Sequence, residues 1–313
     1  MNDENTLIKT AKSSALDIRD QIRVGQKDVA TLNFIRHPGK YIYRRYYLNG
    51  LRSHILAVLD PRAVAMERIG VVKDGVRRFP KARPLKMLRI FRSRFTTLGD
   101  VLHEIERFKI AYGYLGKRHL AMSNEFVVTY QIAGRSEIML CGLQEYVPGV
   151  ALDPWTPMEN EYVAELVRRL IETWLSGQIL LTARLRSAIS KNGLHFVAAV
   201  KKMVQKSGYI PDIAGVRNLL VTLSGEIKLV DINNISAVQY CEDIFVDDKG
   251  YPVCDKSIEA LFLLESHFLG RPADRNDLFY KPFLDPDRMQ AVSECHTNFY
   301  RQLKQNGTRE KKG

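Results

Sequence analysis

Short runs of alternating apolar and polar residues dominate the first half of the chain, and this pattern is typical of β-strands. The runs that predict strands are residues 54–59, 64–72, 85–91, 125–130 and 137–141. Turn chemistry at Lys73-Asp74-Gly75 and at Ala133-Gly134-Arg135 is expected to reverse the chain after the second and fourth runs. Thr97 is expected to cap a helix that follows the third strand and continues to Ile110. The first half therefore predicts an antiparallel sheet with one helix.

Helical periodicity takes over in the second half. Apolar residues recur at helical spacing over residues 158–175, 194–206, 256–269 and 286–305. Two short apolar runs, 218–221 and 227–230, flank Ser224-Gly225 and predict a hairpin. Residues 5–31 also have roughly helical spacing and predict a helix before the main domain. A mainly antiparallel sheet followed by a mainly helical half predicts an α+β fold.

The composition is that of an ordinary globular protein, with 45% hydrophobic and 26% charged residues among 313. No apolar run reaches the roughly 18–20 residues that a transmembrane helix needs, and the polar start of the chain does not resemble a signal peptide. The four cysteines lack metal-ligand spacing, which is typical of reduced cytosolic thiols. We therefore expect a cytoplasmic protein without a transmembrane segment.

The net charge of +12 is concentrated in the first half of the chain. Residues 1–150 hold 26 Lys and Arg against 14 Asp and Glu, whereas residues 151–313 hold 21 of each. Residues 51–100 alone hold 12 basic and 4 acidic side chains. This asymmetry indicates an anionic partner for the basic segment 62–94, such as a nucleotide, a nucleic acid or an acidic membrane. A solvated basic face that only maintains solubility fits the same residues.

Three polar residues around the second-half hairpin carry the strongest chemical signal. Asp212 precedes the hairpin, Asn218 begins its first strand and Asp231 directly follows its second strand. A carboxylate on a loop can accept the proton of a hydroxyl group, and amide and carboxylate oxygens are hard ligands suited to Mg²⁺. The hairpin separates Asn218 from Asp231 by 13 residues. This arrangement resembles the catalytic loop, the following hairpin and the metal-binding Asp of the protein-kinase superfamily.

The resemblance implies an α+β, two-lobed protein-kinase-like fold, with a small antiparallel-sheet lobe and a mainly helical large lobe. The implied divisions are an N-terminal helical extension (1–40), the small lobe (41–144), the large lobe (145–285) and a C-terminal helix with a basic tail (286–313). ATP and Mg²⁺ are the implied cofactors. Asp212 would be the catalytic base, and Asn218 and Asp231 would be the metal ligands.

The sequence departs from the kinase pattern around these residues. Ile210 and Pro211 stand where kinases carry His and Arg, and Asn218 follows Asp212 by six residues where the kinase loop has five. No glycine-rich phosphate loop is found, and the best candidate turn, residues 59–63, contains no glycine. A purely structural interpretation, in which these polar residues make local turn hydrogen bonds, therefore stays open.

Kinases hold the nucleotide phosphates with a strand lysine that pairs with a helix glutamate. Lys86 lies on the third predicted strand and is the preferred candidate, although Lys73 and Lys81 are nearby alternatives. Glu104 and Glu106 lie on the following helix and point about 200° apart, so only one of them can face the strand. We prefer Glu104.

Residues 142–149 follow the last predicted strand of the first half and resemble the kinase hinge. The backbone groups around Glu145 and Val147 are expected to bind an adenine edge. A plain inter-domain linker fits the same residues, and such linkers are also places where ligand clefts form.

The leading hypothesis is an ATP-dependent phosphotransferase that acts on a hydroxyl of a small molecule, a lipid-linked sugar or a protein. The second is a catalytically inactive pseudokinase that serves as a nucleotide sensor or scaffold, which the missing glycine loop favours. The third is a non-enzymatic anion-binding module that uses the stretch from Arg62 to Arg94. The segment between Asp231 and Asp255 is short and lacks an Ala-Pro-Glu motif, which argues against a conventional protein kinase.

Overall fold

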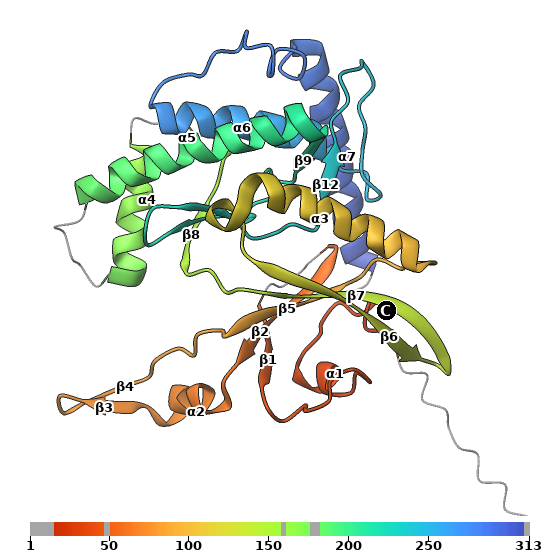
Figure 1. The fold of residues 1–313 in the computed structure, drawn as a ribbon. Coiled ribbons are helices and arrows are strands. Elements are labelled where there is room, and N and C mark those ends of the chain that lie inside the picture. The colour runs from red at the N-terminus through yellow and green to blue at the C-terminus, as the bar shows by residue number, and fades with distance from the viewer. Residues whose placement is uncertain (1–15, 47–50, 158–160, 176–181, 310–313) are drawn as a thin grey trace, which may run out of the picture. The chain divides into compact units, whose positions relative to one another are not determined.

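The computed structural model describes residues 16–46, 51–157, 161–175 and 182–309 (Figure 1). The chain divides into two compact units. The first comprises residues 1–101 and 123–145, and the second comprises residues 102–122 and 146–313. The chain therefore passes from the first unit into the second immediately after Glu145, within the segment expected to form a hinge.

The first unit is built on a five-stranded antiparallel sheet. Its spatial order is β1 (Ile42–Arg45), β2 (Ser53–Leu59), β5 (Lys86–Phe91), β7 (Arg135–Gln144) and β6 (Ser123–Ile132). The predicted hairpin of β6 and β7 is confirmed, and Ala133 and Gly134 close it with positive φ angles of 49° and 77°. Gly134 suits this position because glycine adopts a positive φ without a steric penalty.

The N-terminal segment packs on one face of this sheet instead of forming the expected helix. Ile18, Val24 and Val29 are buried in one cluster with the strand residues Leu88 and Ile90. In the described part of the range 5–31, only α1 (Gln26–Ala30) is α-helical, and residues 16–25 form turns and irregular chain. The expectation of a continuous helix over this part is therefore wrong, because burial against the sheet outweighs local helical spacing.

A helix also replaces the strand expected at residues 64–72. Helix α2 (Pro61–Ile69) begins at Asp60, whose side chain accepts a hydrogen bond of 2.8 Å from the backbone nitrogen of Arg62. Pro61 then occupies the first helical turn, where its missing N–H costs nothing. The turn expected at residues 73–75 is confirmed, because it joins β3 (Val71–Lys73) to β4 (Val76–Arg78) in a separate two-stranded hairpin.

Helix α3 (Leu98–His119) begins with the cap expected at Thr97. The Thr97 hydroxyl accepts from the backbone nitrogen of Asp100, and the Asp100 carboxylate accepts from the backbone nitrogen of Thr97. A non-helical residue, Gly116, interrupts the helix near its end. From residue 102 onward this helix belongs to the second unit, and beyond the break the backbone nitrogen of Ala121 donates to the carbonyl of Leu229 at 2.9 Å.

The second unit is mainly helical. Its helices after α3 are α4 (Tyr162–Leu170), which continues as a π-helical turn (Ile171–Leu175), α5 (Thr182–Ser207), α6 (Val253–Leu269) and α7 (Pro286–Arg309). Helices α5 and α6 lie side by side (Figure 1). Gly193 allows this approach, because a Cβ atom at this position would lie 2.4 Å from the ring of Phe268.

Two small antiparallel sheets complete the second unit. One has the order β11 (Ile227–Leu229), β10 (Leu219–Thr222) and β8 (Gly149–Leu152), and the other pairs β9 (Tyr209–Pro211) with β12 (Ile235–Ala237). The predicted hairpin at residues 218–230 is confirmed as β10 and β11, with Gly225 at a φ of 77°. Helices and antiparallel sheets together confirm the α+β class. No helix in the described ranges is long and apolar enough to cross a membrane.

Candidate functional site

The loop from Asp212 to Asn218 connects β9 to β10. Immediately after β9, one carboxylate oxygen of Asp212 accepts hydrogen bonds from the backbone nitrogens of Ala214 and Gly215, both at 3.1 Å. These two bonds turn the chain sharply and orient the carboxylate. The side chain of Asp212 is half-buried at this turn.

Asn218 closes the same loop. Its amide nitrogen donates to the backbone carbonyl of Asp212 at 2.9 Å, so its amide oxygen points away from that carbonyl. Gly215 makes room for this side chain, because a Cβ atom there would lie 2.4 Å from the Asn218 amide nitrogen. The preceding residue, Arg217, adopts a φ of 76°, which is rare for a residue other than glycine, asparagine or aspartate. The loop is therefore held in one defined and strained conformation.

Two backbone hydrogen bonds bring Asp231 to this loop. The nitrogen of Val230 donates to the carbonyl of Asn218, and the nitrogen of Asp212 donates to the carbonyl of Asn234, both at 2.8 Å. Asp231 lies between these two attachment points, and its carboxylate accepts from the backbone nitrogen of Asn233 at 3.1 Å. The three residues singled out from the sequence thus occupy one local substructure of the second unit.

Side chains from two other parts of the second unit support the loop. The indole nitrogen of Trp155 donates to the carbonyl of Ala214 at 2.8 Å. From α6, the hydroxyl of Ser257 accepts from the backbone nitrogen of Ile213 at 3.4 Å. Helix α6 therefore lies against the loop, and it covers the helix expected at residues 256–269.

Asp255 is the third residue of α6 and does not cap it. Its carboxylate is 3% exposed and forms an ion pair of 2.6 Å with the Nε of Arg288 on α7. The helix is capped instead at Pro252, without a side-chain cap hydrogen bond. The partner of Asp255 lies 33 residues further along the chain, and local spacing contains no signal for that pairing.

Two tyrosines close to Asp212 were not identified from the sequence. Burial raises the pKa of the Tyr251 phenol, and the negative charge of Asp212 raises it further. The pKa of the Tyr300 phenol on α7 is raised by the same two causes. Phe299 contacts both rings, with its ring centroid 5.1 Å from that of Tyr251 and 5.2 Å from that of Tyr300. Tyr300 lies in a helical pattern, where an aromatic residue is usually core, and Tyr251 lies in the irregular chain before α6, so the sequence offered no signal for this proximity.

The expected phosphate-binding residues belong to different units. Lys86 is exposed at the first position of β5, where strand alternation places it on the same side as Leu88 and Ile90. Glu104 lies on the part of α3 that belongs to the second unit, and its side chain is 23% exposed against 60% for Glu106. Glu104 is thus the less solvated of the two candidate glutamates.

The expected hinge residues lie on either side of the division between the units. Glu145 is the last residue of the first unit, and Val147 belongs to the second and is 8% exposed. Gly149 follows at the start of β8, where a Cβ atom would lie 2.4 Å from the carbonyl oxygen of Val221. The segment therefore enters the second unit through a very close backbone contact.

A buried arginine on β5 was also missed. Arg89 is fully buried, and its guanidinium lies 3.8 Å from the carboxylate of Glu125 on β6. Gly142 separates the two residues across β7 and leaves room for their side chains to approach each other. The signal was present in the sequence, since an arginine between apolar neighbours on a central strand has no solvated position available.

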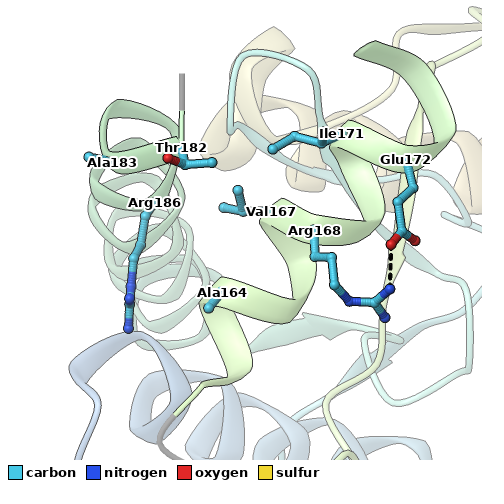
Figure 2. Close-up of a pocket in the computed structure, with 8 residues that line it drawn as sticks. All are labelled: Ala164, Val167, Arg168, Ile171, Glu172, Thr182, Ala183 and Arg186. Carbon is cyan, nitrogen blue, oxygen red and sulfur yellow. Dashed lines mark hydrogen bonds and ion pairs between the residues drawn. The ribbon is translucent and has the colours of Figure 1, made fainter. Parts of the chain in front are cut away.

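A pocket of about 530 Å³ lies between α4, its π-helical continuation and the start of α5 (Figure 2). Its floor is apolar, with Val167 and Ile171, and its rim carries the Arg168–Glu172 ion pair of 2.5 Å. None of the site residues expected from the sequence lines it.

The loop carries two of the oxygen donors that the sequence singled out. Mg²⁺ usually binds one or two protein carboxylates together with phosphate oxygens and water, and Asn218 and Asp231 supply one amide oxygen and one carboxylate of this hard-donor type. Across the described ranges, no three His, Cys, Asp or Glu side chains gather as a metal site.

The sequence was also compared with known proteins. No family model matches the chain, and no curated protein matches it.

Proposed function

We propose that this protein is an ATP-dependent phosphotransferase with a protein-kinase-like active site. The observation that carries the proposal is the pair of backbone hydrogen bonds, Val230 to Asn218 and Asp212 to Asn234, that places Asp231 beside the 212–218 loop. Phosphoryl transfer requires a base and oxygen ligands for the metal on neighbouring segments of the protein, and these bonds join the segments that carry them.

The three residues take separate roles in this proposal. The amide oxygen of Asn218 and the carboxylate of Asp231 bind the Mg²⁺ that accompanies the nucleotide phosphates. Asp212, oriented by two backbone N–H groups, accepts the proton of the acceptor hydroxyl. Lys86 and Glu104 serve the phosphates, and the backbone around Glu145 and Val147 serves the adenine.

The acceptor is a small molecule, a lipid-linked sugar or a protein. A conventional protein kinase is disfavoured by the segment that follows Asp231. This segment contains a tight turn in which Asp247 accepts from the backbone nitrogens of Lys249 and Tyr251 at 2.8 and 2.9 Å. The turn leaves little chain for a peptide-docking platform.

A specific observation also favours the second candidate, a pseudokinase. One oxygen of Asp212 and the amide of Asn218 are engaged in bonds within the loop itself, at 3.1 and 2.9 Å. Such bonds are those of a structural turn, and a scaffold that binds nucleotide without turnover would keep them.

The substitution Asp231→Asn tests the proposal. It retains the size of the side chain and removes the charge that a metal requires. We expect the wild-type protein to bind Mg-ATP in a thermal-shift titration and to hydrolyse ATP slowly, and the variant to lose hydrolysis while its circular dichroism spectrum stays unchanged. Asp248→Asn, at a side chain 58% exposed in the nearby turn, is the matched control and should keep full activity.

Each outcome has a defined meaning. Hydrolysis by Asp231→Asn at the wild-type rate contradicts the assignment of Asp231. Binding of Mg-ATP by the wild type without turnover supports the pseudokinase. Lys86→Ala should raise the ATP concentration needed for half-maximal turnover, whereas Lys81→Ala should not. The opposite result would transfer the phosphate-binding role to Lys81.

A further inference from the structure

The insertion between β2 and β5, formed by α2 and the β3–β4 hairpin, exposes an unusual number of apolar side chains. Figure 1 shows this insertion reaching beyond the edge of the five-stranded sheet. None of the residues of α2 is buried, and all six residues of the hairpin strands are exposed. The exposed apolar side chains are Met66 (40%), Ile69 (59%), Val71 (43%), Val72 (61%), Val76 (55%), Phe79 (61%) and Leu85 (53%). Clustered exposure of this kind marks an interaction surface.

Basic side chains are interleaved with these apolar ones. The exposed cations of the insertion are Arg62, Arg68, Lys73, Arg77, Arg78, Lys81 and Arg83. The opposing charges are fewer, and Glu67 is already occupied: it forms an ion pair of 2.6 Å with Arg44 and accepts from the backbone nitrogen of Ala82 at 2.7 Å. The insertion therefore presents a surplus of positive charge together with apolar surface.

The insertion is a folded element and not a loose loop. The guanidinium of Arg77 donates to the carbonyl of Ile69 at the end of α2, at 2.9 Å. Gly70 adopts a φ of 76° between the helix and the hairpin, and its bare Cα lets the side chains of Arg77 and Phe79 pack against it. These contacts, with the Glu67 bonds, hold the apolar residues in the solvent-exposed position instead of letting them fold away.

On α2, three of the exposed residues form a stripe. Arg62, Met66 and Ile69 are spaced by four and three residues, which places them on one side of the helix. In the hairpin, the paired residues Val71 and Arg78, and Lys73 and Val76, alternate apolar and basic groups across the two strands. Both parts of the insertion thus combine aliphatic and cationic groups at the same surface.

This combination distinguishes between possible partners. A second copy of the chain is disfavoured, because Lys73, Arg77 and Arg78 line both edges of the hairpin and like charges oppose edge-to-edge pairing. The phosphates of a nucleic acid would pair with the basic side chains, but its bases stack on aromatic rings and would make few favourable contacts with exposed valines. Phe79 is the only aromatic residue of the insertion. An anionic lipid surface satisfies both groups, with acyl chains for the aliphatic side chains and headgroups for the cations.

We propose that the α2–β3–β4 insertion docks the protein on an anionic lipid bilayer, with the tip of the hairpin in the headgroup region. A strand of three residues is about 10 Å long, which matches the 5–10 Å to which interfacial elements enter a membrane. The proposal stands apart from the phosphotransferase activity and does not depend on it.

Vesicle co-sedimentation of the full chain tests this inference. We expect binding to vesicles of phosphatidylglycerol and phosphatidylcholine, and much weaker binding to vesicles of phosphatidylcholine alone. The double variant Val72→Ser and Val76→Ser should lower the partition coefficient about tenfold, and Lys73→Ser about fivefold. Because all three side chains are exposed, the variants should unfold at the wild-type temperature.

Matched controls lie in the second unit. Leu278→Ser changes an apolar side chain that is 84% exposed, and Lys281→Ser changes an exposed lysine, so neither should alter vesicle binding. Equal losses for control and hairpin variants would overturn the proposal. Binding to RNA or DNA, but not to vesicles, that the hairpin variants abolish would also overturn it. A dimer in light scattering that the valine variants dissolve, without vesicle binding by the wild type, would assign the surface to a second copy.

Discussion

Removal of the Arg288 guanidinium should strongly destabilise the second unit, because it would leave a buried carboxylate without its counter-ion. Asp255 is 3% exposed and Arg288 10% exposed, and their side chains meet at 2.6 Å. The pair joins α6 to α7, and α6 also carries Ser257, which binds the 212–218 loop. The substitution Arg288→Leu keeps much of the side-chain volume and removes the charge.

The expected loss is about 3 to 5 kcal/mol, which is the usual cost of breaking a buried ion pair from one side. Arg288 makes two further contacts that leucine cannot replace: it donates to the carbonyl of Cys241, and it lies 4.9 Å from the ring centroid of Phe283. For a unit of this size, such a loss lowers the midpoint of thermal unfolding by about 10 °C.

Tryptophan fluorescence is a suitable probe, because Trp155 and Trp174 both belong to the second unit. Urea unfolding should be measured for the wild type, for Arg288→Leu and for Arg301→Leu. Arg301 lies on the same helix, is exposed, and hydrogen-bonds to Asn298. Its substitution should change the free energy of unfolding by less than about 0.5 kcal/mol.

A double substitution separates the ion pair from simple loss of packing. Asp255→Asn in the Arg288→Leu background removes the unpaired charge and should recover part of the lost stability. If Arg288→Leu were no more destabilising than Arg301→Leu, the pair would not stabilise the fold and the reasoning would be refuted. If the double variant were less stable than either single variant, the unpaired charge would not be the cause.

Three further outcomes are expected. Gly215→Ala should displace the Asn218 side chain, since the new Cβ would lie 2.4 Å from its amide nitrogen. Mg-ATP binding in a thermal-shift assay should then weaken, and the free energy of unfolding should fall by about 1–3 kcal/mol. Burial lowers the pKa of His119 below its usual value of 6.5. The unfolded chain therefore takes up the imidazole proton at a higher pH than the folded chain does, and the free energy of unfolding falls as the pH drops below 6.5. The difference between the urea midpoints at pH 7.5 and pH 5.5 should be smaller for His119→Gln than for the wild type. Gly149→Ala should lower the thermal midpoint measured by fluorescence, because its Cβ would lie 2.4 Å from the carbonyl oxygen of Val221, a backbone atom that cannot move aside easily.

Local chemistry in the sequence was sufficient where a few neighbouring residues decide the conformation. Thr97 and Asp100 cap α3 with each other's backbone groups, and Gly225 turns the β10–β11 hairpin, as expected. The expectation at residues 64–72 failed because Asp60 and Pro61 start a helix as readily as they end a strand. The valines and isoleucine that suggested a strand there are not buried in a sheet at all.

The candidate site shows the same distinction. Asp212, Asn218 and Asp231 were singled out by their spacing and their resemblance to the kinase loop and hairpin. The β10–β11 hairpin brings Asn218 near Asp231, and a backbone hydrogen bond to Asn234 attaches Asp212. Tyr251 and Tyr300 were not identified, because each acquires its role from residues on other elements of the fold. The apolar neighbours of Arg89 indicated its burial, but its partner Glu125 lies on another strand.

The sequence by itself determined the α+β class, most helices and hairpins, and the loop residues around which a phosphotransferase site is proposed. These depend on periodicity, capping and turn chemistry, which act within a few residues. Only the tertiary structure decided that residues 16–25 cover a sheet, that Asp255 pairs with Arg288, and that α2 and its hairpin expose their apolar side chains. Burial and ion pairing join residues far apart in the chain, and their free energies exceed the small local preferences that a sequence pattern records.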